Sequence, residues 1–149
     1  MTKELDSSLH SQVAARCKEG DEFALRKDYS AAMSAYSSAW DLLPEPKVNW
    51  EAAMWIQSAI GDALFLSQKY DKALQAFSLA VQCPGGLGNP FIHLRLGECH
   101  CEVGNTERAL DELTRAYMGA DKDIFANENP KYFDLLKSAL KPPLGQSTL

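Results

Sequence analysis

Small and large apolar residues recur at fixed intervals along the chain. Counting from each of three glycines as position i, an alanine stands at i+12, a large apolar residue at i+16 and a second alanine at i+19. The members are Gly20, Ala32, Tyr36 and Ala39, then Gly61, Ala73, Phe77 and Ala80, then Gly97, Ala109, Leu113 and Ala116. The distance from one glycine to the next varies, while the register inside each unit is constant. The pattern predicts three units of a helix, a short turn and a second helix, with the large side chain filling the space beside the small residues.

Polar turns and helix breakers place the boundaries of these units. The turns at 27–30, 68–71 and 104–107 contain Asp, Asn, Ser or Thr, which are suited to cap the helix that follows. We expect one domain over residues 1–149, with units at about 13–46, 54–86 and 90–121. The segment 44–55 is expected to lengthen the third helix at its N-terminal end.

A final amphipathic helix is predicted over about 130–141. Terminal repeats need a cap over their apolar face, and five large residues of this segment are suited to provide one. They are Tyr132, Phe133, Leu135, Leu136 and Leu140. Pro142 and Pro143 are expected to end this helix, which would be the seventh.

Composition favours an all-α chain, and the absence of targeting signals favours a cytoplasmic location. The sequence has 19 Ala and 19 Leu against 4 Val, 4 Ile and 4 Thr, which favours helices over strands. The first ten residues lack the order of a secretory signal, and no apolar run approaches the ~20 residues that cross a bilayer. We therefore expect a cytoplasmic protein whose four cysteines are thiols.

The acidic charge balance bears on partners. Fifteen Lys and Arg against twenty Asp and Glu give a net charge of −5. An acidic chain does not attract phosphate backbones, so nucleic acid and anionic membrane are not expected partners.

Catalytic and metal-binding motifs are weak in this sequence. Cys99, His100 and Cys101, with His93 upstream, suggest a metal site, but Cys99 and Cys101 would point about 200° apart on a helix. No serine-nucleophile, phosphate-loop or zinc-protease motif is present. The sequence therefore favours a protein that is not an enzyme and uses no cofactor and no metal. A metal-dependent or small-molecule enzyme is the alternative that metal analysis would test.

The chain resembles the tetratricopeptide repeat family over roughly residues 13–121. The segment from Tyr29 to Ala39, closed by Pro44, carries that family's small-residue and aromatic signature, and Leu96 and Gly97 form its leucine–glycine pair. The family's early tryptophan is absent from all three units. The resemblance implies a right-handed helical solenoid of about three units plus a C-terminal capping helix.

Such a stack has a concave groove lined by the first helix of each pair, which is where repeat proteins bind. The repeat register predicts nine partner-binding residues there: Lys18, Asp21, Trp55, Asp62, Phe65, Phe91, Arg95, Glu98 and Glu102. Aromatic anchors among charges are typical of protein interfaces. Alternatively, Phe65 and Phe91 belong partly to the core, and Trp55 covers the third helix.

The charges of this groove indicate the kind of partner. Some tetratricopeptide proteins hold a chaperone's C-terminal carboxylates with Lys and Asn on this surface. In this chain Asp21, Asp62 and Glu98 stand at the positions equivalent to those asparagines, where they would repel carboxylates. We therefore expect a basic protein or basic segment as the partner.

The tail at 115–125 and 129–133 resembles that of small bacterial tetratricopeptide proteins found beside polymorphic or Rhs-type toxins. That resemblance implies an immunity protein, which neutralises a cognate toxin by stoichiometric binding. The alternatives are a tetratricopeptide adaptor or secretion chaperone that binds a peptide segment in its groove, and self-association through the same surface.

Overall fold

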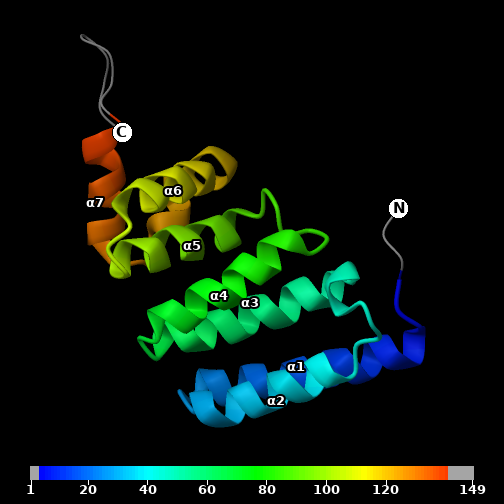
Figure 1. Ribbon diagram of the computed structural model, residues 1–149. Coiled ribbons are helices and arrows are strands. Elements are labelled where there is room, and N and C mark those ends of the chain that lie inside the picture. The colour runs from blue at the N-terminus through cyan, green and yellow to red at the C-terminus, as the bar shows by residue number, and fades with distance from the viewer. Residues whose placement is uncertain (1–3, 141–149) are drawn as a thin grey trace. The chain divides into compact units, whose positions relative to one another are not determined.

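The computed structural model describes residues 4–140, and this part of the chain is helical with no strand. Seven α-helices and two short 3₁₀ turns follow one another (Figure 1). The α-helices are α1 (Ser7–Leu25), α2 (Tyr29–Asp41), α3 (Glu51–Leu66), α4 (Tyr70–Gln82), α5 (Pro90–Glu102), α6 (Thr106–Ala120) and α7 (Pro130–Ala139), and the 3₁₀ turns are η1 (Lys47–Asn49) and η2 (Lys122–Phe125). The predicted all-α arrangement of helix pairs plus a C-terminal helix is confirmed.

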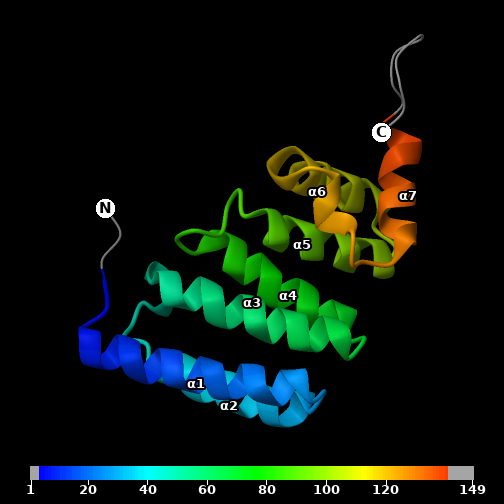
Figure 2. The same cartoon turned by 180° about the vertical axis from the view of Figure 1, so that it is seen from behind.

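The chain divides into two compact units. Unit 1 ends at Leu87 and contains α1 to α4, and unit 2 begins at Gly88 and contains α5 to α7. Within unit 1, α1 and α3 lie on one side and α2 and α4 on the other, as the two opposite views show (Figures 1 and 2). The single domain predicted over residues 1–149 stays a prediction.

At the three glycines of the repeat, the partner helix leaves no room for a side chain. A Cβ atom added to Gly20 would lie 2.4 Å from the ring of Tyr36. At Gly61 it would lie 2.7 Å from the ring of Phe77, and at Gly97 it would lie 2.6 Å from Leu113. The same i, i+16 spacing therefore produces the same contact in each helix pair, which is the packing that the sequence pattern predicts.

The turns inside the pairs also share a geometry. Lys27, Gln68 and Gly104 occupy equivalent positions and all adopt positive φ, at 61°, 63° and 84°. The side chain of Asp28 accepts a hydrogen bond from Ala31 N–H at the start of α2, and the side chain of Asn105 does the same for Arg108 in α6. The N-cap of α4 is Lys69, which makes no side-chain cap. Polar capping is therefore confirmed in the first and third turns and not in the second.

The segment between α2 and α3 differs from the prediction. Only Glu51 onwards is α-helical, and residues before it form a loop with the 3₁₀ turn η1. The indole N–H of Trp50 donates to the carbonyl of Pro44, with 2.7 Å between nitrogen and oxygen. The ammonium of Lys47 donates to the carbonyls of Trp40 and Leu43. These bonds hold the backbone of the segment folded back on the end of α2, so it does not continue the helix.

Unit 2 has its own apolar core, to which α7 contributes. Leu94, Leu113, Phe125 and Leu136 are buried together with Ala116 in this core. The predicted capping residues Phe133, Leu135 and Leu140 pack against it, and Tyr132 is also buried. Asn129 caps α7 and Pro130 occupies its first turn, a position that needs no backbone N–H. Residue 141 and the expected stop at Pro142 and Pro143 lie outside the described residues.

None of the helices within residues 4–140 combines the length and the hydropathy that crossing a membrane requires.

Candidate functional site

In unit 1, one of the predicted binding residues is hydrogen-bonded to a tyrosine of the repeat. Tyr36 of α2 donates its hydroxyl to Oδ1 of Asp21 in α1, with 2.6 Å between the oxygens. The charge of Asp62, from α3, makes the smallest contribution to the raised pKa of this hydroxyl. The pKa of Tyr36 is raised above its usual range. Burial is the largest cause, and the hydrogen bond to Asp21 and the charges of Asp21 and Asp62 add to it. We call Asp21 and Asp62 the acidic pair.

The thiol of Cys17 lies beside this pair on α1. Burial raises its pKa to about 11, and the charge of Asp21 adds to the effect. A thiol with that pKa is protonated at neutral pH and is a poor nucleophile. The acidic pair therefore creates a local negative charge without an activated group beside it.

The aromatic side chains predicted for unit 1 are both half-buried. The ring of Trp55 meets the ring of His10 edge to face, with 5.5 Å between centroids. Both residues line a pocket of about 400 Å³ beside the N-terminal end of α1. Phe65 contacts Tyr70 at 5.5 Å. Lys18 is exposed. Neither aromatic ring is fully buried, so part of each is exposed and can contact a partner.

In unit 2, two predicted residues are interior and bonded to each other. The exposed fraction is 7% for Arg95 and 0% for Glu98. Arg95 Nη1 donates to Glu98 Oε1 at 2.7 Å and also forms an ion pair with Glu128. The guanidinium lies 5.0 Å from the ring centroid of Phe91, which is 38% exposed. Sequence reasoning missed Glu128, because it is distant from Arg95 along the chain and lies outside the repeat pattern.

Glu98 is in an unfavourable place for a negative charge. Its Oε2 is buried and has no hydrogen-bond partner within the described part of the chain. Burial is the main cause that raises the pKa of Glu98 to about 8; the neighbouring Glu128 adds to it, and the charge of Arg95 opposes it. At neutral pH this carboxyl is mostly protonated, so Glu98 adds little to the acidic surface that the sequence predicts.

Glu102, on the last turn of α5, is half-buried, with 12% of its side chain exposed. It forms an ion pair with Lys131 of α7, whose ammonium lies 3.0 Å from Oε2. The pair links α5 to α7 within unit 2. Of the four residues predicted on α5, Phe91 is therefore exposed, Glu102 is half-buried, and Arg95 and Glu98 are buried.

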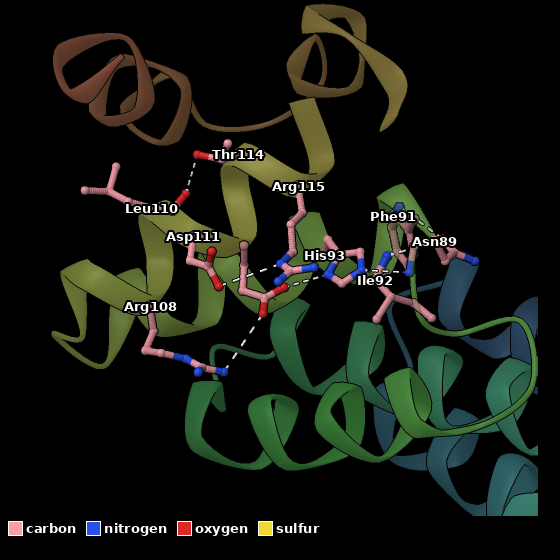
Figure 3. Close-up of polar contacts among 11 residues, drawn as sticks. Asn89, Phe91, Ile92, His93, Arg108, Leu110, Asp111, Thr114 and Arg115 are labelled. Carbon is pink, nitrogen blue, oxygen red and sulfur yellow. Dashed lines mark hydrogen bonds and ion pairs between the residues drawn. The ribbon is translucent and has the colours of Figure 1, made fainter. Parts of the chain in front are cut away.

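His93 has a structural position that fixes its tautomer. Its Nε2 accepts the backbone N–H of Gly88 at 2.9 Å, so the proton is on Nδ1, which donates to Glu112 Oε2 at 2.6 Å. Figure 3 shows this contact, with Arg108 reaching the same carboxylate at 4.0 Å. His93 thereby joins the segment before α5 to α6.

The cysteines that follow this histidine do not form a metal site with it. Cys99 is fully buried, while His100 and Cys101 are half-buried. Within residues 4–140, no three side chains of His, Cys, Asp or Glu converge as metal ligands. Both nitrogens of His93 are already committed to Gly88 and Glu112.

Comparison with known proteins gives a fold and no sequence family. No family model matches the chain, and no curated protein matches it. A solved structure that does match is the N-terminal domain of stress-induced protein-1 (STI-1) from C. elegans, with a TM-score of 0.67. The fold is tetratricopeptide-repeat-like. The match covers 87% of this chain and 98% of the other at 16% identity, and at that identity the likeness speaks for the fold alone.

Proposed function

We propose that the chain is a non-catalytic protein-binding module for a basic partner, working in the cytoplasm without metal or cofactor. The observation that carries this proposal is the acidic pair: Asp21 of α1 accepts a hydrogen bond from the hydroxyl of Tyr36, and the charge of Asp62 of α3 contributes to the raised pKa of that hydroxyl. Trp55 and Phe65 lie half-buried on α3, as anchors beside those charges. A tetratricopeptide-like fold supports the proposal because helix pairs of this kind display such faces to other proteins.

The specific role that we propose is that of an immunity protein. An acidic inhibitor would be steered toward a basic toxin and would block it by stoichiometric binding, either over the active site or by holding an inactive shape. The resemblance of the tail at 115–133 to toxin-associated tetratricopeptide proteins supports this role.

The second candidate is an adaptor or secretion chaperone for a peptide segment. It is favoured by the pocket of about 400 Å³ beside Trp55 and His10, which has room for one anchoring side chain. For this candidate, the single groove substitution Trp55→Ala is expected to abolish binding. For an immunity protein with a larger interface, the same substitution weakens a tight complex without ending it.

A capture experiment followed by a growth assay separates the two candidates. The tagged chain is incubated with lysate of the native organism at low and high salt, and bound proteins are identified by mass spectrometry. An immunity role predicts one near-stoichiometric basic protein that stops growth when expressed alone and does not when co-expressed with this chain. Several weaker partners that share a short segment and have no effect on growth would contradict the immunity role and support the adaptor.

A further inference from the structure

A second surface of unit 1 has the opposite charge to the acidic pair. A groove of about 930 Å³ lies along α2 and the turn that joins α3 to α4. The turn before α2 and the turn before α4 lie at the same end of unit 1 (Figure 1). Three lysines from these two turns and the start of α4 line the groove: Lys27, Lys69 and Lys72.

Within the described residues, these three ammonium groups are not paired with a carboxylate. Lys27, Lys69 and Lys72 are all exposed, and none forms an ion pair with a carboxylate within residues 4–140. The one carboxylate in the lining belongs to Asp28, whose Oδ1 already accepts the N–H of Ala31. In a chain of net charge −5, this groove carries a local excess of positive charge.

Hydroxyl groups continue the polar side of the groove along α2. Ser30, Ser34 and Ser37 are exposed at i, i+4 and i+7, which places them on one helix face. At a rise of about 1.5 Å per residue, they extend over roughly 10 Å. None of these hydroxyls makes a hydrogen bond within the described residues, so all three can donate to a ligand.

The floor of the groove is apolar. Met33 and Leu64 are half-buried there, and the small side chain of Ala63 leaves the space between them. A ligand that fits must therefore be extended, carry negative charge along one edge, and present aliphatic groups to the floor. A protein segment in which acidic and aliphatic residues alternate has that form.

We propose that this groove binds an extended acidic segment of a partner protein. Its carboxylates pair with Lys27, Lys69 and Lys72 and accept from the serine hydroxyls of α2, while its aliphatic side chains cover Met33 and Leu64. A nucleic acid fits less well, because Tyr29 is the one aromatic residue of the lining on which a base could stack. This surface is distinct from the acidic pair and does not depend on the function proposed above.

The test is fluorescence anisotropy of the full-length chain with a short fluorescein-labelled peptide of alternating glutamate and leucine. The variant Lys69→Gln/Lys72→Gln is compared with Lys122→Gln/Lys137→Gln, which makes the same change in net charge outside the groove. We expect binding at least tenfold weaker in the first variant and within twofold of the unmodified chain in the second. Ser34→Glu, which adds a carboxylate to the groove, should abolish binding, and a peptide with glutamine for glutamate should not bind. Circular dichroism verifies that each variant is folded.

Three results would overturn the proposal. The first is an equal loss of affinity in the two lysine variants. The second is displacement of the peptide by an equal concentration of inorganic phosphate or of a short oligonucleotide, which would make the groove a general anion site. The third is salt-dependent self-association in sedimentation that disappears in Lys69→Gln/Lys72→Gln, which would assign the groove to a second copy of the chain.

Discussion

Gly61 lies against the ring of Phe77, which leaves no room for a side chain at this position. A methyl group there would lie 2.7 Å from the ring of Phe77, which is fully buried. Overpacking of this kind costs about 1–3 kcal/mol. The middle of that range, about 2 kcal/mol, exceeds the gain of about 1 kcal/mol in helix propensity when alanine replaces glycine. We expect Gly61→Ala to lower the free energy of unfolding by about 1 kcal/mol, as measured in urea.

A matched pair of variants assigns that loss to the contact. Gln75→Ala, at an exposed position of α4, should change stability by less than about 0.5 kcal/mol. Gly61→Ala combined with Phe77→Leu should lose less than the sum of the two single changes, because the smaller side chain relieves the clash. Additive losses would show that the two residues do not interact.

The raised pKa of Glu98 predicts how the stability of the fold depends on pH. Its pKa is about 8 in the folded chain, above the ordinary value of 4.5, so between these values the folded state binds more protons than the unfolded state. The contribution of Glu98 to the free energy of unfolding is therefore fully present below pH 4.5 and is lost as pH rises through 8. The loss is at most about 1.4 kcal/mol per pH unit. Glu98→Gln removes this titration. We expect the variant to gain stability relative to the unmodified chain as pH is raised from 5 to 8.

The measurement is urea unfolding of both proteins at several pH values. Glu107→Gln, at an exposed position of α6, is the control and should show no such trend. A constant difference between Glu98→Gln and the unmodified chain across this range would contradict the assignment of the raised pKa to Glu98.

At the scale of elements, the sequence is informative wherever structure depends on near neighbours. The constant i, i+16 spacing between each glycine and its large partner predicts the three helix pairs, since both residues belong to one helical hairpin. The helix predicted over 44–55 begins only at Glu51, and the segment 44–50 is a loop that contains the turn η1. Its conformation depends on bonds from Lys47 and Trp50 back to carbonyls near the end of α2, which no local periodicity encodes.

The same reasoning explains which site residues could be found. Asp21 and Asp62 are predictable because each directly follows a glycine of the repeat and so occupies an equivalent position in its unit. The ion pairs of Arg95 with Glu98 and Glu128 could not be predicted, because Glu128 lies in the segment between η2 and α7, far from Arg95 along the chain. The lysine groove was also missed. Its lysines come from two helix pairs, Lys27 from the first and Lys69 and Lys72 from the second, and no sequence motif links residues so far apart.

At the scale of the whole molecule, the charge distribution predicts how association depends on salt. The net charge of −5 and the acidic pair should attract a basic partner at long range, so the association rate should fall as salt screens the charges. We expect Asp21→Asn/Asp62→Asn to bind the captured basic partner with an association rate about tenfold lower at low salt and similar at high salt. Surface plasmon resonance over a range of salt concentrations measures this.

A variant of equal net charge separates local from global electrostatics. Asp41→Asn/Asp123→Asn removes two exposed carboxylates elsewhere in the chain. If the acidic pair is at the interface, this variant keeps a steep salt dependence, whereas Asp21→Asn/Asp62→Asn flattens it. The amide introduced by Asp21→Asn still offers an oxygen to the hydroxyl of Tyr36, so the fold around the pair should be retained. Equal slopes in the two variants would mean that only net charge steers the partner and that the interface lies on another face.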